Sequence, residues 1–414
     1  MAILIKNISS LVTVNSESAL YKIGEQMQDI GEIKNGAMIV SDVIEWIGET
    51  SDLGDIISRY NIDQEIDLKG KTVLPGLVDS HTHIVFGGNR SAEFGQRLRG
   101  ATYAEIAEAG GGIQTTVNAT RNASVDELAE VGRGLALSAA KYGTTSLEVK
   151  SGYSLTVEGE IKQLEAIKKL KETLPLRITP TFMGAHDFPK ESKGNRKTYI
   201  DQIINEMLPL VAENKLAEFN DVFVDKGYYT TEEGTKVLEA GKEYGLLPKA
   251  HCDELADVGA ATMAANAGAI SADHLLFVSD EGIANLKKSG TVAGLLPGTA
   301  YFIKMPYAPA RKLIDSGVIT AIATDCNPGS CFTENMQTIM SLSVINMGMT
   351  AEEAISAATI NGAYSIRKSH EVGSLEVGKK ADFIVCNCNN YIDIFYHFGI
   401  NHVEQTWING KQII

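Results

Sequence analysis

The sequence predicts an α/β protein built as a (β/α)8 barrel of the TIM type, with a small composite β-sandwich domain formed by both chain ends. Between residues 73 and 371, short apolar runs alternate with helical segments, which is typical of parallel strands joined by helices. In residues 1–72 and 372–414, short β-like runs follow one another closely and turn residues separate them. A barrel segment of about 290 residues lies within the usual size range of this architecture.

The composition describes an ordinary globular protein that is acidic overall. Of its 414 residues, 44% are apolar and 21% are charged, and the formal net charge is −15. Without basic runs, this charge argues against a nucleic-acid or anionic-membrane partner. The N-terminal residues lack the pattern of a signal peptide, and no apolar stretch approaches the ~18 residues of a membrane span. Five cysteines are too few for a disulfide framework, and we therefore expect a cytoplasmic protein.

Both chain ends are rich in short β-like runs. Ile3-Leu-Ile and Ala37-Met-Ile-Val lie near the N-terminus, and Phe383-Ile-Val lies near the C-terminus. Asn409-Gly410 is a strong signal for a hairpin turn. Because an isolated hairpin is at best marginally stable, we expect the two ends to form one domain beside a barrel of residues 73–371.

The barrel strands are predicted from apolar runs bounded by turns or helix caps. Eight such runs occur, at residues 77–83, 144–150, 178–186, 221–225, 246–251, 269–274, 292–297 and 319–325. Helical periodicity or caps mark segments between them, at residues 124–141, 160–172, 201–213, 231–244, 256–267 and 279–289. The alternative, a doubly wound open sheet, usually carries a Gly-rich phosphate loop near its first strand, and none is evident. Gly110-Gly-Gly112 indicates either a helix stop with a hinge or a loop that covers a substrate.

Histidines gather where the predicted strands end. His81 and His83 follow the first strand, and in an extended backbone residues i and i+2 point to the same side. Alone, such a pair is modest evidence for a metal site. The carboxyl ends of barrel strands, however, meet on one face, and five of the eight histidines lie at predicted strand ends. The polar residues at these ends are His81, His83, Glu148, Lys150, Tyr153, His186, Asp225, Lys226, His251, Glu254, Asp273, His274, Asp325 and Asn327.

These side chains predict a metal-dependent hydrolase. Three neutral imidazoles and one carboxylate suit a single ion, Zn²⁺ or Fe²⁺/Fe³⁺, and leave a position for water, whose pKa such an ion lowers from 15.7 to about 7. His274 and Glu254 are close enough in sequence to the ligand strands to move protons to a leaving nitrogen. For His274 the alternative is a residue that holds a ligand carboxylate. The assigned metal ligands are His81, His83, His251 and Asp325, and the assigned catalytic residues are Glu254, His274 and Asp325.

The same motifs carry a resemblance to a known family. The segment Pro75-Gly-Leu-Val-Asp-Ser-His-Thr-His83, together with His274 and Thr324-Asp325, resembles the amidohydrolase superfamily. The resemblance covers nearly the whole chain and implies hydrolysis of 4-imidazolone-5-propanoate to N-formimidoyl-L-glutamate in histidine degradation, a single metal ion and a homodimer. The motifs that are similar to the imidazolonepropionase family are Gly87-Gly-Asn-Arg90, Glu148-Val-Lys-Ser-Gly-Tyr153, Gly184-Ala-His186, His251-Cys-Asp-Glu254 and Thr324-Asp-Cys-Asn-Pro-Gly-Ser330.

The resemblance also implies a set of residues that bind the substrate. This substrate is an anion, so a protein that is acidic overall needs a fixed cation, and Arg90 can clamp a carboxylate with two hydrogen bonds. The alternative role of Arg90 is surface solubility. The resemblance places Glu254 at the ring nitrogen. The other expected substrate-binding residues are Tyr103, Tyr153, His186, Asn327, Gly329 and Ser330.

Three positions depart from the family pattern. Cys252 stands where a small residue such as alanine is expected, Ser154 stands where glycine is usual, and Asp225-Lys226 replaces a version with glutamate. Some superfamily members bridge two metals through a modified lysine on the fourth strand. The alternation of side chains turns Lys226 away from the side of Asp225, so we expect one metal, and a role for Lys150 or Lys226 is left open.

Two other functions are weighed against this one. The first is an aminohydrolase that releases ammonia from a purine-like or pyrimidine-like base. Arg90 and the loop of Tyr153 argue against it, because a neutral base has no carboxylate to bind. The second is a non-catalytic barrel that acts in assembly, and the complete set of candidate ligands and proton carriers argues against that function.

Overall fold

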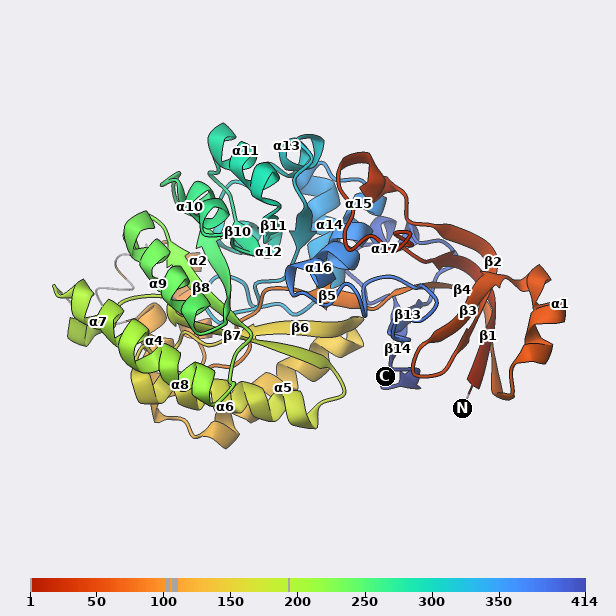
Figure 1. The fold of residues 1–414 in the computed structure, drawn as a ribbon, viewed down its shortest axis with the longest axis horizontal. Coiled ribbons are helices and arrows are strands. Elements are labelled where there is room, and N and C mark those ends of the chain that lie inside the picture. The colour runs from red at the N-terminus through yellow and green to blue at the C-terminus, as the bar shows by residue number, and fades with distance from the viewer. Residues whose placement is uncertain (1, 102–104, 106–110, 193) are drawn as a thin grey trace.

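The computed structural model describes residues 2–101, 105, 111–192 and 194–414. Figure 1 shows a barrel surrounded by helices and, beside it, a sheet in which the first and the last strands of the chain lie together. Both chain ends lie at this sheet, as the predicted composite domain requires. Among the described residues, no helix combines the length and the apolar character needed to cross a membrane.

Eight parallel strands form the barrel sheet, in the order β12-β11-β10-β9-β8-β7-β6-β5. Each of the eight predicted runs overlaps one of them, which confirms the predicted barrel. The strands are β5 (Leu77–Asp79), β6 (Thr144–Lys150), β7 (Arg177–Ala185), β8 (Phe219–Val224), β9 (Leu247–Cys252), β10 (Ser271–His274), β11 (Val292–Leu295) and β12 (Thr320–Ile322).

The barrel closes where β5 meets β12. An isolated parallel bridge joins Thr82 to Cys326, just beyond the ends of the two strands. The backbone N–H of Asp325 donates to the carbonyl of His81 at 3.0 Å, and the N–H of His83 donates to the carbonyl of Cys326 at 2.9 Å. The first and last strands are therefore connected at the level of the predicted metal ligands.

Helices follow most barrel strands and cover them. Ser124 caps α5 as predicted, because its hydroxyl accepts from the N–H of Glu127 while the Glu127 carboxylate accepts from the N–H of Ser124. The helices are α2 (Ser91–Leu98), α4 (Ile113–Asn122), α5 (Val125–Lys141), α6 (Val157–Thr173), α7 (Arg196–Gln202), α8 (Leu208–Glu213), α9 (Thr231–Glu243), α10 (Ala260–Asn266), α11 (Asp280–Ser289), α12 (Pro297–Ile303), α13 (Ala310–Asp315), α14 (Met336–Met347), α15 (Ala351–Ala358) and α16 (Ile360–Ser365).

Three helices begin at least three residues from their predicted starts. The helix predicted at 160–172 begins at Val157, and the other two differences have a local cause. The helix predicted at 256–267 begins at Ala260, because the Asp253 carboxylate accepts the N–H groups of Val258, Ala260 and Ala261 and so fixes a turn before it. The helix predicted at 201–213 begins earlier, with α7, and a π-helical turn (Ile203–Met207) joins α7 to α8.

The chain ends form one seven-stranded sheet in the order β15-β14-β13-β4-β1-β2-β3. The two chain ends share one hydrophobic cluster, to which Ile8, Met38, Phe383 and Trp407 belong. The predicted domain limit at residue 72 falls inside β4, and the domain limits remain a prediction. The strands are β1 (Ala2–Val12), β2 (Glu32–Val40), β3 (Ile44–Glu49), β4 (Ile62–Pro75), β13 (Phe383–Cys386), β14 (Val403–Ile408) and β15 (Lys411–Gln412). Short helices α1 (Leu53–Ile56) and α17 (Asp393–Tyr396) lie in its connections.

The turn predicted at Asn409-Gly410 is present. Both residues have positive φ, 49° and 67°, and the turn joins β14 to β15 with Ile408 opposite Lys411. Two successive residues with positive φ define the hairpin turn that an Asn-Gly pair favours.

Candidate active site

A cavity of about 490 Å³ opens at the carboxyl ends of the barrel strands. It gathers most of the residues that the sequence predicts, although they come from different strands and loops. His81 lies beside the cavity and is 1% exposed. The described lining residues are His83, Arg90, Arg97, Ile113, Tyr153, His186, Phe223, Tyr228, His251, Glu254, Leu255, His274, Ile303, Met305, Asp325, Asn327, Gly329 and Ser330.

The four predicted metal ligands lie against one another. The Nε2 atoms of His81 and His83 are each 3.6 Å from Oδ1 of Asp325. The Nε2 atoms of His251 and His83 are 3.3 Å apart. All four side chains are buried. Donor atoms of His81, His83 and Asp325 lie within 4.8 Å of one another, and His251 adjoins this group through Nε2 of His83.

In two of these histidines a carboxylate accepts a hydrogen bond from Nδ1, which makes Nε2 the nitrogen that can bind an ion. Nδ1 of His81 donates to Asp273 at 2.7 Å, and Nδ1 of His251 donates to Asp221 at 3.1 Å. Burial lowers the pKa of His81 well below its usual value, so this imidazole is neutral. Its Nε2 is buried and has no hydrogen-bond partner among the residues that the structure describes. A carboxylate that fixes the tautomer of an imidazole in this way is typical of metal-binding histidines, and the donor set therefore fits a divalent ion.

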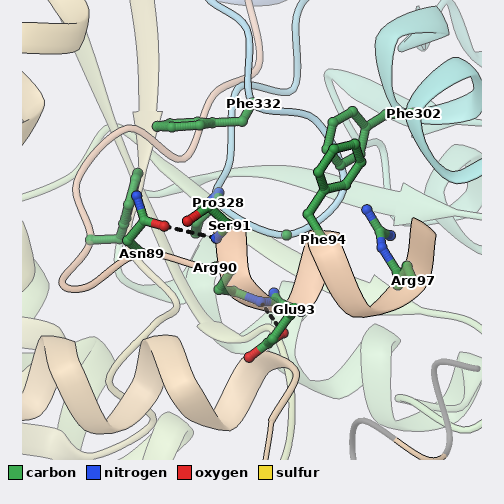
Figure 2. Close-up of a pocket in the computed structure, with 11 residues that line it drawn as sticks. Asn89, Arg90, Ser91, Glu93, Phe94, Arg97, Phe302, Pro328 and Phe332 are labelled. Atoms are coloured by element: carbon green, nitrogen blue, oxygen red, sulfur yellow. Dashed lines mark hydrogen bonds and ion pairs between the residues drawn. The ribbon is translucent and has the colours of Figure 1, made fainter. Parts of the chain in front are cut away.

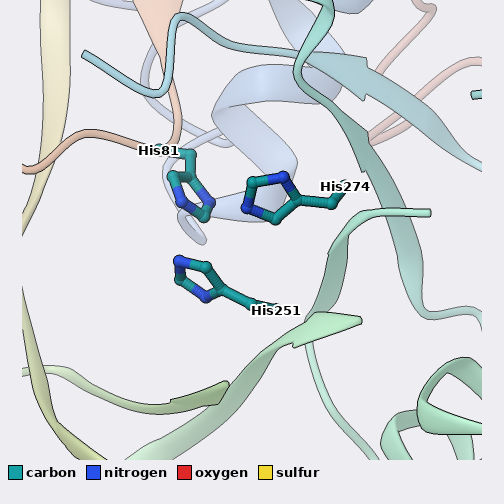
Figure 3. A group of neighbouring side chains, drawn as sticks. All are labelled: His81, His251 and His274. Carbon is teal, nitrogen blue, oxygen red and sulfur yellow. The ribbon is translucent and has the colours of Figure 1, made fainter. Parts of the chain in front are cut away.

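His274 lies beside the predicted ligands. Figure 3 shows the rings of His81, His251 and His274 turned toward one another, and one nitrogen of each lies within 4.8 Å of the others. Its Nδ1 is 3.7 Å from Oε2 of Glu254. His274 and Asp325 have positive φ, 78° and 52°, which costs backbone energy that the surrounding contacts must offset. Strained backbone of this kind gathers at functional sites.

Two carboxyl groups of the cavity have raised pKa values. Burial, followed by the negative charges of Asp325 and Asp225, raises the pKa of Glu254 to about 8. Burial raises the pKa of Asp325 to about 6, against the hydrogen bond that Thr299 donates to its Oδ2 at 2.5 Å. A cation placed between these carboxyl groups and the imidazoles would favour the charged form of both.

A network of buried charges supports the predicted ligands from inside the barrel. Nζ of Lys150 lies 2.6 Å from Glu148 and 2.8 Å from Asp221. Nζ of Lys249 donates to the carbonyl of Ser80 at 3.1 Å and lies 4.0 Å from Asp273. The two carboxylates that hold His81 and His251 thus each face a buried lysine. The sequence left the role of Lys150 open, and in the structure Lys150 forms an ion pair with Asp221.

The sequence reasoning overlooked part of this network. Asp221 and Lys249 lie within predicted strands and received no role. The sequence does contain a sign of their role. A charged residue inside an apolar strand needs a partner on the inner face of the barrel, and both residues lie in such strands. Lys226 is exposed, which agrees with its expected direction away from the site.

Arg90 lies at the wall between the large cavity and a smaller one of about 240 Å³. Its Nε donates to Glu93 at 2.9 Å, as Figure 2 shows, and Glu93 in turn accepts from the hydroxyl of Thr115 at 2.6 Å. A side chain at Gly329 would collide with the guanidinium of Arg90. The side chain of Arg90 is largely buried, and Glu93 holds it in place. Both facts argue against a role in surface solubility alone.

Tyr153 and His186 form an adjoining wall with His83. The ring of His186 stacks on that of His83 with centroids 5.1 Å apart, and the ring of Tyr153 lies 5.2 Å from that of His186. Nδ1 of His186 donates to the carbonyl of Gly152 at 3.0 Å. Burial lowers the pKa of His186 to about 3, so it presents a neutral ring.

The loop after β12 is organised by Asn327. Its Oδ1 accepts the N–H groups of Gly329 and Ser330, each at 2.8 Å, and its Nδ2 donates to the carbonyl of Asp325 at 2.7 Å. These groups were predicted to donate to the substrate, and in the structure they hold the loop together. Their contact with substrate remains a prediction, as does that of Tyr103, which lies outside the described residues. Gly112 is the residue before α4, and Gly110 lies outside the described residues.

A parallel barrel whose strand ends bring several imidazoles and carboxyl groups to one cavity is typical of metal-dependent hydrolases. A model of the amidohydrolase family matches residues 72–413. Imidazolonepropionase from Geobacillus sp. (strain WCH70) is 47% identical over 99% of this chain and 97% of its own length. Those from Alkaliphilus metalliredigens and Porphyromonas gingivalis are 45% and 44% identical, each over 100% of this chain and over 98% and 97% of their own lengths. The chain belongs to the amidohydrolase family and, within it, to the imidazolonepropionases.

Solved structures share the fold at low sequence identity. An adenosine deaminase from Xanthomonas campestris with bound zinc has a TM-score of 0.70 at 18% identity, over 99% of this chain and 92% of its own. A guanine deaminase from C. acetobutylicum with bound guanine has a TM-score of 0.70 at 17% identity, over 100% of both chains. These similarities concern the fold alone, and they agree with the barrel and the added sheet.

Proposed function

We propose that this protein hydrolyses the ring of 4-imidazolone-5-propanoate to give N-formimidoyl-L-glutamate in histidine degradation. The observation that carries the proposal is the placement of Arg90 in the wall of a cavity that also contains the histidine and aspartate cluster, in a chain that belongs to the imidazolonepropionases. The substrate has a carboxylate at one end and a reactive ring at the other, and the cavity offers a partner for each.

The ligand residues would hold one ion, zinc or iron, and the lone pair of His81 Nε2 is the observation that favours it. When bound, such an ion polarises a carbonyl group and activates water at neutral pH. The chain's own contribution is to fix ligand geometry. Asp273 orients His81, Asp221 orients His251, and Thr299 orients Asp325.

Glu254 and His274 would transfer the protons. Addition of water to the ring carbonyl carbon and cleavage of its bond to the ring nitrogen require one proton to move from the water to that nitrogen. Nδ1 of His274 lies 3.7 Å from Oε2 of Glu254. An imidazole and a carboxyl group can each accept or donate a proton, so this pair can carry the proton from the water to the ring nitrogen.

Arg90 and His186 would orient the substrate. The guanidinium has N–H groups beyond the Nε that binds Glu93, and two of them match the geometry of a carboxylate. His186 is neutral and uses Nδ1 for Gly152, so its Nε2 suits the ring of the substrate better than its carboxylate. Tyr153 completes this wall.

The experiment is to incubate the purified, metal-loaded protein with imidazolonepropionate and to identify the product by mass spectrometry, with guanine and cytosine as comparison substrates. We expect formation of N-formimidoyl-glutamate and no release of ammonia from either base. Turnover of a base without turnover of imidazolonepropionate would support the deaminase alternative, and an inert, metal-free protein would support the assembly alternative. The homodimer that the family resemblance implies is part of the proposal, and sedimentation of the same sample measures it.

A further inference from the structure

The loop that carries Tyr153 into the cavity is held by a buried carboxylate on the following helix. Oε2 of Glu160, in α6, accepts the backbone N–H of Gly152 at 2.8 Å. Its Oε1 accepts the N–H groups of Ser154 at 2.9 Å and Leu155 at 2.8 Å. Glu160 has no exposed surface, so these hydrogen bonds are made away from water, where a charged acceptor forms its strongest bonds.

A second side chain of α6 completes the set. Oε1 of Gln163 accepts the N–H of Tyr153 at 3.1 Å, while its Nε2 donates to the carbonyl of Val85 at 2.6 Å. The four successive N–H groups from Gly152 to Leu155 thus donate to Glu160 and Gln163. Gln163 is also fully buried, and its bond to Val85 links the loop to the segment that follows the first barrel strand.

The carbonyl groups of the loop have side-chain partners too. Nδ1 of His186 donates to the carbonyl of Gly152 at 3.0 Å, and Nε of Arg121 donates to the carbonyl of Ser154 at 2.7 Å. Gly152 and Leu155 have positive φ, 109° and 54°, so the loop cannot continue as a regular strand or helix. Its shape depends on these side chains, because buried backbone groups that lack a partner are costly.

These contacts connect Glu160 to both residues of the substrate wall. Tyr153 lies between two residues whose N–H groups Glu160 binds, and the carbonyl of Gly152 fixes which nitrogen of His186 carries the proton. Among the described residues, the partners of Glu160 are backbone N–H groups of this loop and the side chain of Ser151 rather than a cation, so its carboxyl group acts on the position of the loop. We propose that Glu160 is a positioning residue that sets Tyr153 and His186 for substrate binding. This inference rests on the proposed function.

The test compares Glu160→Gln with Glu158→Gln, a change of the exposed glutamate in the same turn of α6. In Glu160→Gln the shape of the side chain is kept, but one acceptor oxygen becomes an NH₂ group that faces a backbone N–H. We expect KM for imidazolonepropionate to rise about tenfold, with kcat changed far less, and metal content to equal that of the wild-type protein. Glu158→Gln should leave both constants unchanged.

A double-mutant cycle with Tyr153→Phe separates positioning from general stability. If Glu160 acts through the loop, the fold increase in KM of the double variant Glu160→Gln/Tyr153→Phe will be well below the product of the fold increases of the two single variants. Gln163→Met, which removes the acceptor of the Tyr153 N–H and leaves Glu160 in place, is measured in parallel and should raise KM in the same direction. This second variant keeps the test independent of the folding of the first.

The outcomes separate this inference from the proposed function. A wild-type protein without turnover of imidazolonepropionate contradicts the proposed function itself. With wild-type turnover established, unchanged KM in both Glu160→Gln and Gln163→Met, or independent effects of Glu160→Gln and Tyr153→Phe, contradicts the positioning role alone. Loss of metal together with activity in Glu160→Gln would also contradict it, because the role proposed here leaves the ligands in place.

Discussion

The two sides of the cavity are built in different ways. On the strand side, His81, His83 and His251 are at most 3% exposed, and carboxylates and lysines inside the barrel support them. On the loop side, Arg90 precedes α2, a helix without a single buried residue. Segments with little buried surface open and adjust more easily than the core of a fold. The comparison teaches that the ion is assigned to the buried ends of the barrel strands, whereas the carboxylate of the substrate is assigned to a residue beside an exposed helix.

The largest effect is expected on the strand side. His251→Ala removes one predicted ligand, and we expect loss of bound metal and a fall in kcat/KM of about 10³-fold or more, the scale of the charge stabilisation that an ion supplies. Elemental analysis and turnover measure both quantities. His370→Ala, at an exposed histidine outside the barrel strands, is the matched control. Full metal content in His251→Ala would show that His251 is not a ligand.

A smaller effect is expected at Asp221, which contacts the predicted ligand His251 from inside the barrel. Asp221→Asn removes the carboxylate that accepts from His251 Nδ1, and we expect metal affinity to fall about 10- to 100-fold. Competition with a chelator measures this affinity, with Asp126→Asn, at an exposed carboxylate, as control. Equal affinity in the two variants would remove Asp221 from the support of the site.

On the loop side, we expect substitution of Arg90 to weaken substrate binding rather than metal binding. Arg90→Ala removes the proposed carboxylate partner, and we expect KM to rise about tenfold or more while metal content is kept. Arg99→Ala, at an exposed arginine just after α2, should leave KM unchanged. If Arg90→Ala loses as much metal as His251→Ala, the division between the two sides is wrong.

The smallest effect is expected at the outer surface of the loop side. The ring of Phe94, in α2, stacks on that of Phe302 with centroids 4.8 Å apart (Figure 2). Phe94→Ala removes this contact, and we expect KM to change about threefold, with unchanged metal content. Steady-state kinetics measures the change. A loss of metal in this variant would show that α2 supports the strand side as well.

The sequence predicts the strand side better than the loop side, for a physical reason. Alternation along a strand tells which side chains share a face, and a barrel brings all strand ends together, so the sequence alone is enough to group His81, His83, His251 and Asp325. The partners Asp221, Lys150 and Lys249 depend on the register between strands, which local periodicity does not specify.

On the loop side, contacts depend on backbone shape that the sequence encodes less directly. The predicted donors at Gly329 and Ser330 bind Asn327 in the structure. The four N–H groups accepted by Glu160 and Gln163 are local contacts between a loop and the next helix. Helical periodicity does not predict the contacts of Glu160, because a buried glutamate in an amphipathic helix has the same spacing whether it binds a cation or a loop.

The central claim is that the strand side holds one ion on which turnover depends. Its most direct test is to remove metal with a chelator and to follow turnover of imidazolonepropionate as zinc or iron is added back. The claim predicts that activity rises linearly and stops rising at one equivalent of metal per chain. A break at two equivalents, or full activity in the metal-free protein, would contradict it.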